Sequence, residues 1–172
     1  MASPLVISTS LRNGSLSRAM ADQLVLEYAA LKAKAEEIDL RKWPLPLCDG
    51  DAAYADPQVE QLAARITAAS VIILATPVYN YHVSAATKNL IELTGSAWED
   101  KLVGFLCAAG GASSYMSVMH LANSLMLDFR CLILPRFVYG VSSDFSSTTQ
   151  PGPELTRRLR QLAEDSLKIR RD

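Results

Sequence analysis

Short apolar segments alternate with segments of helical periodicity along the chain, and this alternation constrains the fold more than any other feature. Four runs have the length and composition of buried strands, at residues 5–9, 71–76, 102–108 and 131–134, and 36–40 is a weaker candidate. Between them, apolar residues recur at helical spacing, first at Leu16, Met20, Leu24 and Leu31 and then at Val59, Leu62, Ala63 and Ile66. Because right-handed crossovers return each strand beside an earlier one, this order predicts a doubly wound α/β fold with helices on both faces of a mostly parallel sheet.

Several residues mark the ends of the expected helices. Asp56 is expected to cap a helix that starts at Pro57, and Gly95 is expected to end the helix that contains Leu90 and Ile91. A final helix is marked by Leu155, Leu159, Leu162 and Ile169. Neither an internal repeat nor an interdomain linker is evident, so we expect a single domain over residues 1–172.

Composition excludes several classes of function. The chain is 49% hydrophobic and 20% charged with a formal net charge of -1, which argues against disorder and against nonspecific nucleic-acid binding. No apolar run approaches the length of roughly 20 residues that is needed to span a bilayer. The N-terminus also lacks the basic segment followed by an apolar stretch that is typical of a secretion signal. We therefore expect a cytoplasmic protein with small-molecule substrates and neither a nucleic-acid nor a membrane partner.

The cysteines and histidines do not form a metal-binding pattern. Cys48, Cys107 and Cys131 are widely spaced and lack a CxxC pair, so free thiols are expected, with Cys107 and Cys131 buried as small hydrophobic side chains. His82 and His120 are not accompanied by an acidic cluster. We therefore predict no metal site.

The first expected strand leads into a loop rich in hydroxyl groups. In an open parallel sheet, ligands bind beyond the carboxyl ends of the strands, so the loops at 9–17, 77–84 and 109–114 are the places to look for chemistry. The first loop combines Ser10, Arg12, Gly14, Ser15 and Ser17 at a helix N-terminus, where backbone N–H groups and the helix dipole favour a phosphate. The alternative is that Ser15 only caps the helix and the rest is a polar turn. GxxxxGK[ST] and GxGxxG are both absent, so this loop differs from the nucleotide-binding loops defined by those motifs.

Two further loops have residues suited to a flat heteroaromatic ring. After the strand at 71–76, Pro77 can shape a rigid turn, Asn80 offers a donor and an acceptor, and Tyr79 and Tyr81 offer apolar faces. Tyrosines beside a turn can instead cover the edge of the core. Gly110-Gly111 precedes another helix, and its amides favour negative charge, although an ordinary glycine turn is the alternative.

Together these motifs resemble the NAD(P)H-dependent FMN reductase family of flavodoxin-like proteins along nearly the whole chain. The resemblance rests on Ser10, Arg12, Ser15 and Ser17, on residues 76–81, on Gly110-Gly111 and on residues 88–92. It implies a five-stranded parallel sheet of order 2-1-3-4-5, with FMN as cofactor and NADPH or NADH as hydride donor. It also implies an FMN phosphate against Ser10, Arg12, Ser15, Leu16 and Ser17, and a ring bordered by Pro77, Val78, Tyr79, Asn80, Tyr81, Gly110 and Gly111.

Hydride transfer between two stacked rings requires no acid–base triad, so Tyr79 and Asn80 are expected to support the ring rather than to move protons. The Gly110 and Gly111 amides would stabilise the charge of reduced flavin. His82 is a candidate contact for the second substrate, and a histidine without function on an exposed loop is the alternative.

The chain also departs from the family pattern. Thr9 stands where many members have glycine, Val78 stands where many have glutamate, and residues 112–114 lack further glycines. Val78 places the chain nearer the branch that supplies reduced FMN to two-component sulfonate monooxygenases, which implies such a partner.

Apolar residues surround the helix expected at 115–129, and by resemblance this suggests a homodimer or homotetramer, with Met-rich core packing as the alternative. Two other functions stay open. One is an FMN-dependent quinone, azo or chromate reductase, and the other is a non-enzymatic flavodoxin-type electron carrier or flavin sensor.

Overall fold

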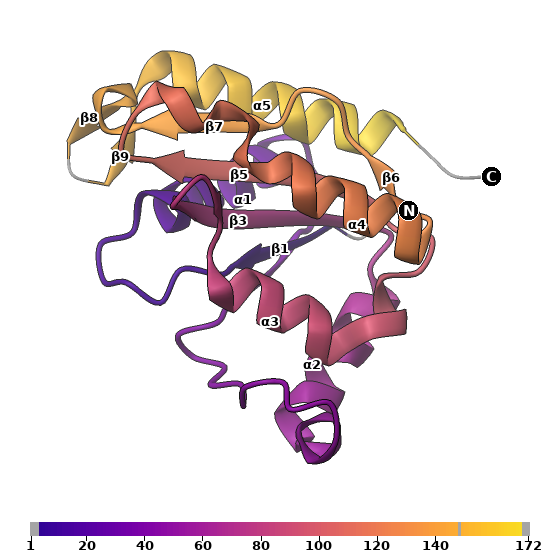
Figure 1. Cartoon of the computed structure of the whole chain (residues 1–172). Coiled ribbons are helices and arrows are strands. Elements are labelled where there is room, and N and C mark those ends of the chain that lie inside the picture. The colour runs from indigo at the N-terminus through magenta and orange to yellow at the C-terminus, as the bar shows by residue number, and fades with distance from the viewer. Residues whose placement is uncertain (1–3, 148, 170–172) are drawn as a thin grey trace.

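A central parallel sheet forms the middle layer of the molecule (Figure 1). The computed structural model describes residues 4–147 and 149–169. The strand order is β2-β1-β3-β5-β6, and β7 continues the edge beyond β6 by pairing parallel to β5. This confirms the predicted doubly wound sheet and its 2-1-3-4-5 order when β6 and β7 are taken together as the fifth strand. The strands are β1 (Pro4–Ser8), β2 (Glu36–Asp39), β3 (Val71–Tyr79), β4 (His82–Val83), β5 (Leu102–Ala109), β6 (Leu132–Ile133) and β7 (Val138–Val141).

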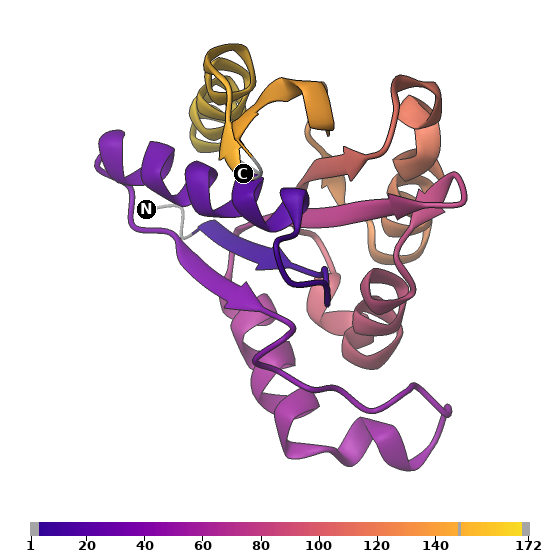
Figure 2. The same cartoon turned by 90° about the vertical axis from the view of Figure 1, so that its left-hand side faces the viewer.

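Helices cover both faces of this sheet, because the buried strands are apolar on both sides. Val6 and Ile73 face a core shared with α1 and α5, whereas Leu5 and Ile72 face a second core shared with α2, α3 and α4. Figure 2 shows α1 and α5 on one side of the sheet and α2 and α3 on the other. The helices are α1 (Leu16–Ala30), α2 (Pro57–Ala68), α3 (Ala85–Thr94), α4 (Met119–Phe129) and α5 (Pro153–Lys168), with short 3-10 helices η1 (Ala52–Ala55), η2 (Gly95–Trp98), η3 (Ala112–Val118) and η4 (Ser142–Asp144).

The predicted helix ends are confirmed by their caps. The Asp56 carboxylate accepts a hydrogen bond from the Gln58 backbone N–H, with Pro57 at the first position of α2. Gly95 ends α3 with a positive φ of 34°, a conformation that costs glycine little. Among the helices of the described residues, none is long and apolar enough to cross a membrane.

The fifth strand differs from the expected segment at 131–134. Only Leu132–Ile133 pairs there, and pairing resumes at Val138. Leu132 lies opposite Leu102 and Val138 lies opposite Leu106, so the edge strand uses more residues than β5 between these two pairs. Pro135, which lacks an N–H, lies within the interruption. The short hairpin of β8 (Phe145–Ser147) and β9 (Gln150–Pro151) was likewise not predicted.

The helix expected at 115–129 is also different. Residues 112–118 form the 3-10 helix η3, and the α-helix begins only at Met119. Val118, Leu121 and Leu125 are buried, whereas Met119 and Met126 are 41% exposed and Leu127 is 77% exposed. Core packing therefore does not explain the whole apolar circumference of this helix.

Candidate functional site

The carboxyl ends of β1, β3 and β5 bring loops from distant parts of the sequence around one cavity of about 150 Å³. We call it the loop cavity. Ser8 pairs with Ala75 and Pro77 pairs with Ala108, so the loops that follow these strands start side by side. The lining residues are Ser10, Arg12, Ser15, Leu16, Ser17, Pro77, Val78, Tyr79, Ala108, Ala109, Gly110 and Ser142. The lining thus includes every predicted site residue except Asn80, Tyr81 and Gly111, which lie in the same loops beside it.

The first loop places hydroxyl groups over the N-terminus of α1. Ser15 caps α1, because its Oγ accepts a hydrogen bond from the Arg18 backbone N–H at 3.4 Å, and its hydroxyl lies 2.9 Å from that of Ser17. Gly14 has a φ of 64°, which glycine adopts with little strain. Ser15 therefore caps the helix, as the alternative interpretation of this loop expected. Ser15 also lines the loop cavity.

Arg12 supplies a positive charge at the mouth of the loop cavity. Its side chain is exposed, and no ion pair or hydrogen bond engages its guanidinium within residues 4–147 and 149–169. Its backbone N–H donates to Ser10 Oγ at 3.4 Å. The charge is therefore available for an anion placed at the helix N-terminus.

The second loop is a tight β-hairpin rather than an irregular segment. β3 continues to Tyr79 and pairs antiparallel with β4, with Val78 opposite Val83 and Tyr79 opposite His82. Asn80 and Tyr81 make the turn with φ values of 51° and 62°, the left-handed conformation that two-residue hairpins require. Tyr79 is 50% exposed and Tyr81 is 51% exposed, so neither tyrosine serves mainly to cover the core.

The hairpin also contacts α4 through a pair of histidine rings. His82 stacks on His120 with ring centroids 5.4 Å apart. This contact links the turn that carries Tyr79 and Tyr81 to the helix that follows the third loop.

The third loop exposes its backbone beside Gly110 and Gly111. A Cβ added at either glycine would meet no protein atom within 4 Å, so nothing in the protein interior requires glycine there. The hydroxyl of Tyr139, in β7, donates to the Gly111 carbonyl at 2.5 Å and lies 3.1 Å from Ser114 Oγ. The hydrogen bond from Tyr139 therefore holds the turn in place, while the positions that Cβ atoms would take at the two glycines stay free of protein contacts.

Sequence reasoning missed three residues of the lining: Ala108, Ala109 and Ser142. Ser142 directly follows β7, the part of the fifth strand that was not predicted. The short segment Val138–Val141 could have revealed Ser142, because assigning a strand to this segment places Ser142 at the carboxyl edge of the sheet.

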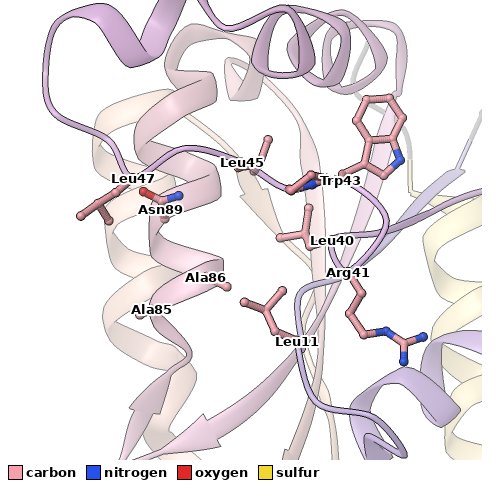
Figure 3. A pocket seen from close by; sticks show the side chains of 10 residues that line it. Leu11, Leu40, Arg41, Trp43, Leu45, Leu47, Ala85, Ala86 and Asn89 are labelled. Atoms are coloured by element: carbon pink, nitrogen blue, oxygen red, sulfur yellow. The ribbon is translucent and has the colours of Figure 1, made fainter.

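A second and larger cavity, of about 490 Å³, lies between α3 and the segment after β2 (Figure 3). We call it the apolar cavity. Its lining consists of Leu11, Leu40, Arg41, Trp43, Pro44, Leu45, Leu47, Ala85, Ala86 and Asn89. The amide of Asn89 holds the wall with both its oxygen and its nitrogen, since it accepts from the Cys48 backbone N–H at 2.8 Å and donates to the Pro46 carbonyl at 2.9 Å.

Arg41 belongs to a charged cluster that ties β2 to the first loop. Its Nη2 lies 2.8 Å from Asp39 Oδ2, and its Nη1 donates to Asn13 Oδ1 at 3.2 Å. Arg18 Nη1 lies 2.7 Å from the same Asp39 oxygen. Burial alone would raise the pKa of the Asp39 carboxyl, but hydrogen bonds from Arg41 and the charge of Arg18 outweigh it and lower the pKa below its ordinary value.

None of the three cysteines, which all lie in the described part of the chain, lines the loop cavity. Cys107 and Cys131 are buried, as expected, and burial raises the pKa of the Cys107 thiol to about 12. This thiol stays protonated near neutral pH, so it is a poor nucleophile. Within the described residues, no cluster of histidine, cysteine, aspartate and glutamate is arranged to hold a metal ion.

Three solved or curated proteins show what the chain is similar to. An NAD(P)H-dependent FMN reductase of Pseudomonas aeruginosa is 31% identical over 169 residues, which cover 95% of this chain and 90% of that protein. An NADPH azoreductase of a Bacillus species is 27% identical over 73% of this chain and 72% of its own length. The crystal structure of an NADH:FMN oxidoreductase in its apo form superposes with a TM-score of 0.81 at 16% identity, covering 100% of this chain and 92% of that one.

A family model provides the assignment that these similarities support. The model described as NADPH-dependent FMN reductase matches residues 4–146, a range that includes all three loops of the loop cavity. The chain therefore belongs to the NADPH-dependent FMN reductase family.

Proposed function

We propose that the protein is an NAD(P)H-dependent FMN reductase that holds FMN at the loop cavity. This proposal depends on one observation: three loops, remote in sequence, meet around one cavity. They place there an arginine that has no ion pair among the described residues, a helix N-terminus with serine hydroxyls, and an open glycine turn. These groups fit the chemistry of FMN, which has a phosphate dianion at one end and a flat ring at the other.

The residues divide between the two ends of FMN. Arg12, Ser10, Ser15 and Ser17 would hold the phosphate by charge-assisted hydrogen bonds, with Leu16 beside them. The ring would be held by Pro77, Val78 and Tyr79 together with Asn80, Tyr81, Gly110 and Gly111. Bound FMN would supply the chemistry by accepting hydride from NADPH or NADH.

The protein's own part in this reaction is positioning and electrostatics. Among the residues lining the loop cavity, Arg12 and Tyr79 are the ones with titratable side chains, so the lining offers no acid–base pair. The exposed amides of the glycine turn would stabilise negative charge on the reduced ring, and the Tyr79 face would keep water from it.

We also propose that the single domain works in the cytoplasm as a homodimer or homotetramer. The apolar side chains left exposed on η3 and α4 support self-association: Tyr115, Met116, Met119, Met126 and Leu127. Sedimentation of the wild type against Met119→Ser/Leu127→Ser would test it, and an unchanged, monomeric sedimentation coefficient for both would contradict it.

A flavin-dependent monooxygenase that takes reduced FMN is the partner we propose for the product.

Anaerobic spectroscopy tests the activity. FMN is added to the purified protein, and the visible absorbance of oxidised flavin is followed after mixing with NADPH or NADH. We expect bleaching with at least one nicotinamide, faster than in a protein-free control. Binding without bleaching would indicate an electron carrier instead, and no binding would contradict the assignment of the loop cavity.

The azoreductase similarity supports one alternative acceptor. If FMN stays bound through turnover and a quinone or azo dye is reduced in ping-pong kinetics, the protein is a reductase of those acceptors. If FMN enters and leaves in each cycle, it supplies reduced flavin.

A further inference from the structure

A buried cluster of hydroxyl groups lies beneath two of the loops that line the loop cavity. Thr9, Thr76 and Thr87 have no exposed surface, and Ser84 is 5% exposed. Thr9 is the first residue of the first loop, Thr76 directly precedes Pro77, and Ser84 and Thr87 belong to the start of α3. These residues do not line the cavity, so the proposed contacts to FMN leave the cluster unexplained.

Thr87 is the centre of the cluster. Its Oγ1 lies 2.6 Å from Thr9 Oγ1, 2.8 Å from Thr76 Oγ1 and 2.9 Å from Ser84 Oγ. These are short O–H···O distances, so one side chain of α3 is hydrogen-bonded at once to the base of the first loop and to the base of the hairpin.

One arrangement of protons satisfies the whole cluster. Thr9 donates to the Ala75 carbonyl at 3.1 Å, so it accepts from Thr87. Thr87 then has two lone pairs left, which accept from Thr76 and Ser84. The Ser84 backbone N–H donates to Thr76 Oγ1 at 3.3 Å, and the Thr87 N–H donates to Ser84 Oγ at 3.3 Å. The Thr76 hydroxyl also lies 3.1 Å from the Pro77 carbonyl, which is a second acceptor for its proton. In this arrangement each of the three contacts of Thr87 holds one proton, and a buried network of such hydrogen bonds is rigid.

We propose that Thr87 is a positioning residue that fixes the spacing between the phosphate loop and the ring hairpin, through Thr9 on one side and Thr76 on the other. This inference rests on the proposed function. It also gives a physical role to Thr9, because a residue without a side-chain hydroxyl at this position would leave Thr87 no partner at the base of the first loop.

The spacing matters because FMN joins a flat ring to a phosphate through a ribityl chain of limited length, so one ligand has to reach both loops. A ligand that engages both loops gains from their being held at the right separation, whereas riboflavin, which lacks the phosphate, depends on the ring hairpin alone. Loss of the Thr87 hydroxyl should therefore weaken FMN more than riboflavin.

The test compares Thr87→Val, which keeps the shape and removes the hydroxyl, with Thr87→Ser, which keeps the hydroxyl. The matched control is Thr94→Val at the other end of α3, where Thr94 Oγ1 donates to the Leu90 carbonyl at 2.7 Å and accepts from Trp98 Nε1 at 2.8 Å. Dissociation constants for FMN and riboflavin are measured by flavin fluorescence, with urea unfolding as the measure of stability.

We expect Thr87→Val to weaken FMN roughly tenfold and riboflavin by less than about twofold. Thr87→Ser should restore most of the FMN affinity. Thr94→Val should lower the free energy of unfolding about as much as Thr87→Val does, and it should leave the FMN affinity within about twofold of wild type.

Equal FMN affinity in wild type and Thr87→Val would overturn the inference, as would equal weakening by Thr94→Val. If Thr87→Val does not fold, Thr9→Ala removes one connection to the network and should also lower the FMN-to-riboflavin affinity ratio; an unchanged ratio contradicts the role of Thr87. A wild type that binds no FMN contradicts the proposed function instead, so the two failures are distinguishable.

Discussion

The loop cavity and the apolar cavity lie on either side of the first loop, and they differ in what their polar groups are doing. The apolar cavity is the larger, at about 490 Å³ against about 150 Å³, but its Arg41 and Asn89 are already engaged with the protein. The loop cavity has an arginine without an ion pair in the described residues, and a glycine backbone open on one side. Polar groups still lacking partners, rather than volume, therefore identify the place for a charged ligand.

The first prediction removes the two strongest phosphate donors of the loop cavity. Arg12→Ala combined with Ser15→Ala should weaken FMN at least about a hundredfold, since each charge-assisted hydrogen bond contributes about 1.5–3 kcal/mol. Riboflavin affinity should change little because it has no phosphate. Calorimetric titration of both flavins measures this effect.

Leu47→Ala is the matched control in the apolar cavity, where Leu47 is 82% exposed. It should leave both affinities unchanged. If the double variant binds FMN as tightly as wild type, or if Leu47→Ala weakens FMN to the same degree, the distinction between the cavities is wrong.

The second prediction fills the open side of the glycine turn. Gly110→Val adds a side chain that meets no protein atom, so the fold should lose less than about 1 kcal/mol while FMN affinity falls roughly tenfold. Gly104→Val in the same strand region is the contrast, because its Cβ would lie 2.8 Å from Ile73 Cδ1 and should destabilise the fold by about 1–3 kcal/mol. A Gly110→Val variant with wild-type FMN affinity would show that the ring does not approach this turn.

The third prediction concerns the wall of the apolar cavity. Asn89→Ala removes the hydrogen bonds to Pro46 and Cys48 and should cost about 1–2 kcal/mol of unfolding free energy. FMN affinity should stay at the wild-type value. Urea unfolding and flavin titration together check it, and a large loss of FMN affinity would mean that the two cavities act as one site.

The fourth prediction is a pH dependence that originates at Asp39, which pairs with Arg41 of the apolar cavity. The folded-state pKa of Asp39 is lowered, so the folded state holds the ionised form more strongly than the unfolded chain does. The stabilisation is complete above the ordinary carboxyl pKa of about 4 and is lost as the pH falls below it, through the folded-state pKa.

Asp39→Asn should therefore lower stability at pH 7 by about 1 kcal/mol and flatten the loss of stability as the pH falls below about 4. Urea unfolding midpoints across this range give the comparison. A variant with the same acid dependence as wild type would assign that dependence to other carboxylates.

The sequence was sufficient to predict the layers of the fold and most of the lining of the loop cavity. Strand periodicity, the Asp56 and Gly95 caps and the three loops were enough, because burial and capping are local consequences of residue type. The interrupted fifth strand was not predictable in the same way. It depends on pairing with β5 across a proline-containing segment, and Ser142 was missed with it.

The hydroxyl network and the apolar cavity were also beyond local reasoning. Thr9, Thr76 and Thr87 meet only when β1, β3 and α3 pack together, so their spacing in the sequence carries no signal. Asn89 similarly forms a hydrogen bond with Cys48, which lies 41 residues earlier in the sequence.

The central claim is that FMN lies in the loop cavity with its phosphate at the start of α1. A crystal structure of the protein with FMN tests it most directly. We predict phosphate oxygens within hydrogen-bonding distance of Arg12 and Ser15 and the ring between Tyr79 and Gly110. FMN seated in the apolar cavity, or a loop cavity left empty at saturating FMN, would contradict the account.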